Sequence, residues 1–468
     1  MLQALIRKFW SSPHGVKWLT CIGINLAIGA YYSAALVAPA SSPIKSAWLP
    51  GKTTHGHYQI ELDCDACHDP NSSDDKHSSQ NVMQDACLRC HGEQLKGVDT
   101  HPAKKFNDPT NAELLATLDA QNCLSCHAEH VPHQTLEMGL TMPSDYCWHC
   151  HQDVADSRPS HDGMAFDSCS TAGCHNYHDN SALYEKFLDD HFGEPDFLDA
   201  AINPQRDTVS TVSQKGWPKE KLDRGDADFP ESVSVSEPTL ADWAETSHAA
   251  AGVNCTACHL ADQEDNSSWS DAVSLETCGT CHDKQAESFL TGKHGMRLAA
   301  GLSPMTPSQA RLPMHHDAAH RELDCNACHQ GHRFDTAFAA TEACLGCHAD
   351  DHSIAHSQSS HADLWRAEVT GEGDAGSGVS CATCHMPRLQ GDDGVWVNHD
   401  QNANLRPNEK MAREVCMNCH GLEYSLSALA DENLIRNGFS GTPTERNKSV
   451  EMAHQWFIER AQKRRERP

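Results

Sequence analysis

Cysteine pairs followed at once by histidine are the residues of this sequence whose types and spacing fit a specific chemistry. The chain has 23 Cys in 468 residues, and all but Cys21 fall into eleven pairs. Ten pairs have the form Cys-x-x-Cys-His: Cys64/Cys67/His68, Cys87/Cys90/His91, Cys123/Cys126/His127, Cys147/Cys150/His151, Cys255/Cys258/His259, Cys278/Cys281/His282, Cys325/Cys328/His329, Cys344/Cys347/His348, Cys381/Cys384/His385 and Cys416/Cys419/His420. The eleventh pair is wider: Cys169 and Cys174, followed by His175.

This spacing suits the covalent attachment of haem. Two thiols reach the two vinyl groups of one porphyrin as thioethers, and the next His lies under the ring as an iron ligand. A lone Cys-x-x-Cys would fit a zinc half-site or a redox dithiol equally well, but neither of those needs the His. The sequence therefore predicts eleven covalent haem c groups, each with its motif His as the proximal ligand. For Cys169 and Cys174 the alternative is a disulfide or two free thiols.

Histidines outside the motifs are numerous enough to close the second axial position of every iron, since 33 His are present. Met in that position would raise the reduction potential, but the abundance of His favours bis-histidine haems. Three motifs continue as Cys-His-x-x-His, and a His three residues on cannot cross to the other face of its own ring. We expect it to bind a neighbouring haem. The distal candidates are His57, His77, His101, His130, His161, His178, His248, His294, His316, His320, His332, His361 and His399.

The composition limits both the fold and the partners. A formal net charge of −29 argues against a nucleic-acid partner and favours solubility or basic partners. Eleven haems between Cys64 and His420 leave little room for regular structure. We expect a mostly irregular fold with short α-helices, a haem-packed core, almost no β-structure, and folding that depends on haem. The candidate helices are Ser181–Phe192, Met411–Cys416 and Val450–Arg465.

The motifs are arranged in two blocks, separated by 79 residues that contain none. The segment Glu61–His68 is echoed by Glu322–His329, which indicates a duplicated unit. The predicted divisions are a cytoplasmic basic tail (1–17), a transmembrane signal-anchor helix (18–38), a pentahaem domain (55–195), a linker (196–236), a hexahaem domain (237–425) and a C-terminal tail with a basic helix (426–468). The basic end of that tail is either a solvated helix end or a contact to anionic lipid or an acidic partner.

The N-terminus predicts the location of the haems. Basic residues precede an apolar stretch from Trp18 to about Val37, and roughly 20 such residues can span a bilayer with the N-terminus inside. Asn25 weakens this prediction, and the alternative is a signal peptide cleaved near Ala40. In both cases the haems lie on the periplasmic side of a bacterial inner membrane, because thioether attachment takes place outside the cytoplasm.

Several strings of the second block carry a resemblance to a known superfamily. They are Trp243–His248 leading into Gly252–Cys255, Gly378–Pro387, then His399 and the closing motif at Cys416. With them the second block resembles the pentahaem nitrite reductases and octahaem hydroxylamine oxidoreductases. The resemblance implies that His399, after the Cys-x-x-Cys-His-Met-Pro string, is a distal ligand. The first block resembles small penta- and tetrahaem periplasmic electron carriers, and the N-terminus is similar to membrane-anchored quinol-oxidising cytochromes.

Two functions are compatible with these patterns. One is an electron-transfer protein with no catalytic residue, which takes electrons from the membrane (quinol or a quinol-oxidising partner) to a periplasmic or outer-membrane partner. The other is a reductase or oxidase of a small nitrogen or sulfur compound with one open haem in the second block. Catalysis at iron needs an open coordination position. The resemblance implies a Cys-x-x-Cys-Lys motif at the catalytic haem of a nitrite reductase, and a Tyr crosslinked to the catalytic haem of a hydroxylamine oxidoreductase. This chain has no such Lys motif, and the only Tyr of its second block, Tyr424, follows the last haem motif. Ample His, the absence of the Lys motif and the net charge of −29 together favour electron transfer.

Overall fold

The described part of the chain consists of an N-terminal helix and two regions that contain haem motifs. The computed structural model describes residues 13–37, 51–61, 63–68, 79–96, 109–113, 122–136, 139–142, 151–157, 161, 178, 220–260, 269–391, 394–405, 408, 410–444, 455, 458–459, 462–463 and 465. We call residues 51–178 the first half and residues 220–444 the second half. Outside the described residues lie Cys147 and Cys150, the Cys169 motif with His175, His77, His101, the predicted helix Ser181–Phe192 and most of Val450–Arg465.

The described residues form many short helices and one small sheet. The first half and the N-terminus contain α2 (Pro13–Val37), η1 (His55–Ile60), η2 (Cys64–Ala66), α4 (Ser79–Lys96), η3 (Pro109–Asn111), α7 (Cys123–Cys126) and α9 (Val154–Ser157). The second half contains η7 (Arg224–Asp226), α11 (Glu237–Ala244), α12 (Ser247–Ala250), α13 (Cys255–His259), α14 (Leu275–Gly279), α15 (Asp283–Thr291), α16 (Met296–Ala299), η8 (Pro307–Gln309), η9 (His316–Ala318), α17 (Cys325–His329), α18 (Thr336–Ala340), α19 (Glu342–Leu345), α20 (Asp351–His356), α21 (Ser360–Thr370), α22 (Cys381–His385), β1 (Arg388–Gly391), β2 (Gly394–Val397), α23 (Lys410–Glu414), η10 (Cys416–Asn418), α24 (Leu422–Ala430) and α25 (Glu432–Arg436).

Many haem motifs fold as a single helical turn because a polar residue directly before the first Cys caps it. The side chains of Asn254, Asp324 and Ser380 accept hydrogen bonds from backbone N–H groups in the first turns of α13, α17 and α22. In such a turn, residues three apart lie on one face of the helix. The cap therefore places both thiols of a motif on the same side, where one porphyrin can take them.

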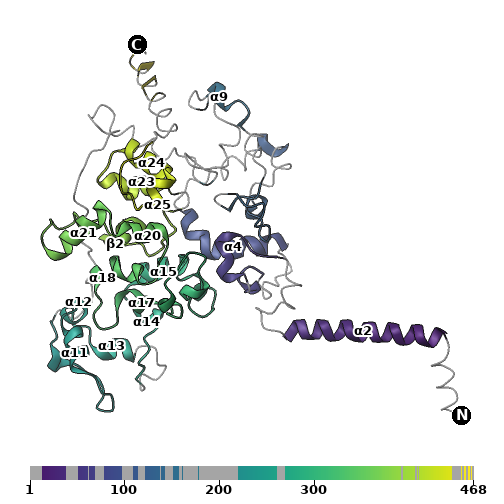
Figure 1. Cartoon of the computed structure of the whole chain (residues 1–468), viewed down its shortest axis with the longest axis horizontal. Helices are drawn as coiled ribbons and strands as arrows, with labels where there is room; N and C mark the ends of the chain where they lie inside the picture. The colour runs from purple at the N-terminus through teal and green to yellow at the C-terminus, as the bar shows by residue number, and fades with distance from the viewer. Residues whose placement is uncertain are drawn as a thin grey trace.

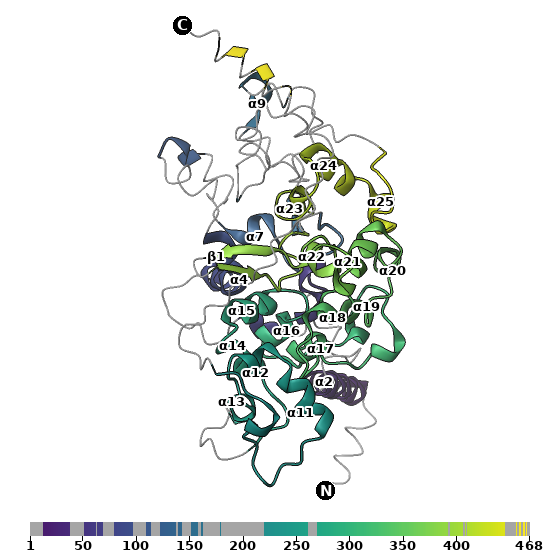
Figure 2. The same cartoon turned by 90° about the vertical axis from the view of Figure 1, so that its left-hand side faces the viewer.

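The second half runs in chain order from α11 to α25, as the teal-to-yellow progression in Figures 1 and 2 shows. Within the described part of the chain the only sheet is the antiparallel hairpin β1–β2, which pairs Leu389 with Trp396. The hairpin leads directly into His399, whose backbone N–H donates to Ser288 Oγ of α15 at 2.9 Å. The predicted fold class, mostly irregular with short helices and almost no β-structure, is confirmed for these residues.

The predicted transmembrane helix is not supported. Helix α2 covers the expected stretch and extends away from the haem-motif regions (Figure 1). However, among the described residues no helix combines the length and the apolar character needed to cross a bilayer. Polar residues interrupt the apolar stretch, and Asn25 uses its side-chain amide to bond the Cys21 carbonyl at 2.8 Å.

The packed second half extends beyond the predicted domain limits at both ends. Two residues of the predicted linker bond to the second half: Asp228 accepts from the Thr256 hydroxyl of α13, and Leu222 N–H donates to the Ala249 carbonyl at 2.9 Å. Past residue 425, helices α24 and α25 continue the core, with Leu426 and Leu429 buried against α23. These side chains pack against one another in an apolar cluster.

Candidate haem-binding site

Among the described residues, histidines face one another in eight pairs that each contain one motif His and one non-motif His. The ring centres of each pair are 5.8 to 6.3 Å apart. The pairs are His91 with His57, His127 with His178, His259 with His332, His282 with His248, His329 with His399, His348 with His294, His385 with His352 and His420 with His361. All six motif histidines of the second half are included.

The separation of the rings fits one metal ion between them. A metal–imidazole bond of about 2.0–2.1 Å on each side, plus half a ring, places the two ring centres roughly 6 Å apart. Direct stacking would bring the rings closer, as in the contact of 4.3 Å between His259 and Trp269. Because each of these pairs joins a motif His to a non-motif His, the geometry fits haem iron with one proximal and one distal imidazole.

Hydrogen bonds at Nδ1 orient several of these rings. An imidazole that donates its Nδ1 proton to an oxygen keeps Nε2 free for a metal, an arrangement typical of metal-bound His. The acceptors lie 2.5 to 3.2 Å from Nδ1: the Glu129 carboxylate for His57, and the carbonyls of Gly139, Ser270, Ile435 and Val397 for His127, His259, His352 and His399. His130 makes the same kind of bond to the Gly51 carbonyl at 3.0 Å.

Burial lowers the pKa of several paired imidazoles and so favours the neutral state, which can bind a metal. Burial and then the partner His399 lower the pKa of His329 to about 4. Burial lowers the pKa of His294 and His361 to about 4 as well, with the partners His348 and His420 adding to the effect. The lone pairs of these three rings are therefore available at neutral pH.

Space for the porphyrins is present between the pairs of the second half. A connected cavity of about 2340 Å³ is lined by motif residues of five second-half motifs and by distal candidates such as His248, His294 and His332. A single small-molecule site occupies about 300–1,000 Å³. The cavity can hold more than one flat apolar group, and the residues present fit haem.

Attachment points of successive motifs lie next to one another. In the second half the thiols of Cys278 and Cys325 hydrogen-bond, and so do those of Cys344 and Cys381. The remaining neighbours are close enough to interact electrostatically: Cys258 with Cys278, Cys328 with Cys347 and Cys384 with Cys416. The six motifs from Cys255 to Cys419 therefore form one unbroken series in chain order.

The first three motifs of the first half repeat this arrangement. Cys67 lies within electrostatic range of Cys90, and the thiols of Cys87 and Cys123 hydrogen-bond. Once haem is attached these thiols become thioethers, so each contact locates two neighbouring porphyrin edges.

Three motif histidines of the first half are more exposed than the half-buried motif rings of the second half. His68, His91 and His151 were all predicted to be proximal iron ligands, and the structure places all three side chains at exposed positions. His91 still lies opposite His57, whereas the roles of His68 and His151 stay predictions from the motif. The physical reason is the shortage of large apolar side chains in the described first half, where the buried apolar residues are Ala86 and Cys126. Protein atoms alone do not cover these rings, and the thiols that precede His151 lie outside the described residues.

Seven of the thirteen distal candidates lie opposite a motif His: His57, His178, His248, His294, His332, His361 and His399. His332 and His178 each face a motif other than the one they follow, as expected for Cys-His-x-x-His. His332 reaches its partner through a backbone φ of 69°, a conformation that L-residues adopt rarely.

Other candidates are placed differently. His316 and His320 are exposed, and neither forms a ring pair with a motif His in the described part of the chain. His161 is half-buried, and His130 faces Gly51. The assignment of His316 and His320 as distal ligands therefore stays a prediction from the sequence.

Sequence reasoning missed two histidines of helix α20. His352 lies opposite His385 with ring centres 6.1 Å apart. The sequence signal for His352 is its position four residues after the motif His348, which is close to the three-residue spacing of the Cys-His-x-x-His motifs. His356, one helical turn further, is buried and lines the cavity, and both of its ring nitrogens lack a hydrogen-bond partner among the described residues.

Comparison with known families adds an independent observation. The sequence model of the family described as Cytochrome c3 matches residues 56–152 and 247–349. Each matched segment contains four of the haem motifs, and the second one coincides with the series from Cys255 to His348. The chain is a multihaem c-type cytochrome. No curated protein and no solved structure matches it.

The family model matches two segments that each contain four haem motifs, which indicates that the multihaem cytochrome is built from a repeated four-haem unit. The distal histidines agree with this repeat, since His57 lies seven residues before Cys64 and His248 lies seven residues before Cys255. The finer resemblance to nitrite reductases and hydroxylamine oxidoreductases stays a hypothesis. Tyr424 stacks on the motif His420 and donates to the Gly441 carbonyl at 3.4 Å.

Proposed function

We propose that this cytochrome is an electron conduit that carries eleven haems, with bis-histidine iron throughout its second half. The observation that carries the proposal is the pairing of every second-half motif His with a non-motif His. An iron with two imidazole ligands has no open position for a substrate, but it can still be reduced and oxidised. The unbroken series of attachment points supplies the route.

The rival function, reduction or oxidation of a small nitrogen or sulfur compound, requires an open haem. The open haem was expected in the second half, but every motif His there lies opposite a non-motif His. An anion would also need a positive pocket, and the chain has a net charge of −29. Both observations favour the conduit.

Location and partners follow from the chemistry of the cofactor and from the surface. We place the haem-bearing part outside the cytoplasm, on the periplasmic side, because haem c is attached there. The acidic surface fits redox partner proteins with a basic docking face, and nucleic acid is an improbable partner for the same reason. Association with such a partner slows as the salt concentration rises, because screening weakens electrostatic steering.

Ligand-binding spectroscopy tests the proposal. The ferric protein is titrated with cyanide and nitrite, and the ferrous protein with carbon monoxide. We expect low-spin spectra that do not change on addition of any of the three. A high-spin haem that binds nitrite, together with nitrite turnover, would establish the enzyme instead. Haem quantification with intact-mass measurement tests the count of eleven.

A further inference from the structure

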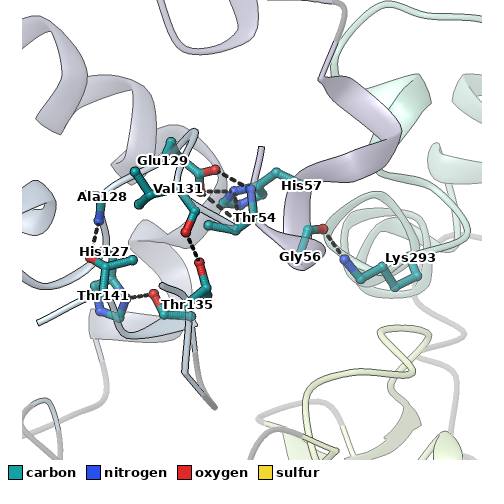
Figure 3. Close-up of polar contacts among 11 residues, drawn as sticks. Thr54, Gly56, His57, His127, Ala128, Glu129, Val131, Thr135, Thr141 and Lys293 are labelled. Atoms are coloured by element: carbon teal, nitrogen blue, oxygen red, sulfur yellow. Dashed lines mark hydrogen bonds and ion pairs between the residues drawn. The ribbon is translucent and has the colours of Figure 1, made fainter. Parts of the chain in front are cut away.

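The 3-10 helix η1 of the first half is fastened to helix α16 of the second half and to the turn that precedes it. Gln59 Nε2 donates to the Lys293 carbonyl, and Arg297 Nη1 donates to the Gln59 carbonyl, both at 2.8 Å. The Lys293 ammonium donates to the Gly56 carbonyl, as Figure 3 shows. Gln59 is only 6% exposed, so the two bonds that it makes are partly shielded from water, whereas the bond between Lys293 and Gly56 is exposed. We call this set of contacts the clamp.

Each side of the clamp is adjacent to a distal histidine. On the first-half side Gly56 precedes His57, which faces His91. On the second-half side Lys293 precedes His294, which faces His348. The clamp would therefore hold a haem of the Cys87 motif beside a haem of the Cys344 motif.

A third haem lies at the same junction. A side chain at Gly292 would place its Cβ 3.1 Å from Cα of Asp400 and 3.2 Å from the carbonyl of His399, so these backbones are in contact. His399 faces His329. Asp400 is also near His91 of the first half, since the two interact electrostatically.

From these contacts we infer that electrons cross between the two halves at the haem held by His57 and His91. This inference rests on the proposed conduit function. His57 follows Gly56, which contacts Lys293 beside the ligand His294. His91 lies near Asp400, which follows the ligand His399. Among the first-half haems whose ligand pair is described, this is the one with both ligands at the junction. The clamp fixes the gap across which the electron passes. The step is a one-electron exchange in which the crossing haem is oxidised as its second-half neighbour is reduced, or the reverse.

Flash photoreduction tests the crossing. A ruthenium photoreductant is attached to the thiol of a Val369→Cys variant, because Val369 is 53% exposed on α21. His57→Met then marks the crossing haem, because Met/His ligation raises its potential and changes its spectrum. An electron delivered to the second half should settle on the marked haem. In Lys293→Ala/Arg297→Ala its arrival should slow by about tenfold, an added barrier of roughly 1.4 kcal/mol.

The matched control is Arg224→Ala/Arg436→Ala, which removes two cations from exposed positions away from the clamp. Haem content and the low-spin spectrum are verified in each variant, and Arg297→Gln replaces the double variant if that loses haem. Equal arrival rates in clamp and control variants would overturn the crossing while leaving the conduit intact, and would direct attention to His178, which is near Lys410. An electron that never leaves the haem next to the label, even without clamp changes, would overturn the conduit itself.

Discussion

The two halves place equivalent distal histidines in different surroundings. His57 and His248 each lie seven residues before the first Cys of their half, and each faces the second motif His. His57 Nδ1 binds the Glu129 carboxylate at 2.5 Å, whereas the Nδ1 of His248 is buried without a hydrogen-bond partner among the described residues. The repeated sequence fixes the ligand, and the residues around it set its electronic character.

Glu129 is held firmly in its ionised form. Burial alone would raise its pKa, but hydrogen bonds from His57 and from the Thr54 backbone and hydroxyl lower it to about 2 (Figure 3). A carboxylate on Nδ1 makes an imidazole a more basic ligand, which stabilises ferric iron. The crossing haem should therefore have a lower potential than its second-half counterpart.

The halves also differ in what fills their interior. In the described part of the first half the buried apolar side chains are Ala86 and Cys126, one of them a haem-attachment residue. The second half adds the apolar cluster of α23 and α24, with Met411 and Leu422 buried. The first half therefore depends on haem for its core, and the C-terminal end of the second half depends on it less.

Preventing haem attachment should have the largest effect. Chain produced without haem maturation should lose most of its helical circular dichroism, because porphyrin faces supply most of the core. Hydrogen exchange should find the remaining protection in α23 and α24. Equal protection of both halves in the apoprotein would contradict the difference between them.

Replacing a distal ligand should change one haem without unfolding the chain. His294→Ala opens one iron, so electron paramagnetic resonance should show one high-spin ferric haem that binds cyanide. His316→Ala, at an exposed histidine with no ring pair among described motif residues, is the matched control and should stay fully low-spin. A high-spin signal in the control would show that the assignment of ligands from ring pairs is wrong.

Removing the charge of Glu129 should have the smallest effect and tests the comparison of His57 with His248 directly. Glu129→Gln should raise the potential of the crossing haem by roughly 60 mV, equivalent to a tenfold weaker preference for the ferric state. Glu129→Asp should restore part of the shift. Asp350→Asn is a control in the second half, where the carboxylate lies 3.6 Å from His348 Nδ1, and should shift its haem less. A redox titration that monitors the magnetic resonance signals of the individual haems measures the haem potentials in all three variants.

The sequence alone predicted the features that local spacing determines. The Cys-x-x-Cys-His turns and the reach of His332 and His178 to neighbouring haems follow from short-range geometry. The roles of His352 and Glu129 depend on which elements pack together, and a contact over 72 residues, such as that between His57 and Glu129, leaves no local pattern. The transmembrane prediction is not supported, because no helix among the described residues is long and apolar enough to cross a bilayer.

A haem-loaded experimental structure tests the central claim most directly. The account predicts an iron between the two rings of each of the eight histidine pairs, and porphyrin edges in contact in chain order from the Cys255 motif to the Cys416 motif. It also predicts the Cys87 haem at the junction of the halves. A second-half iron with a single protein ligand, or a break in the series, would contradict the account.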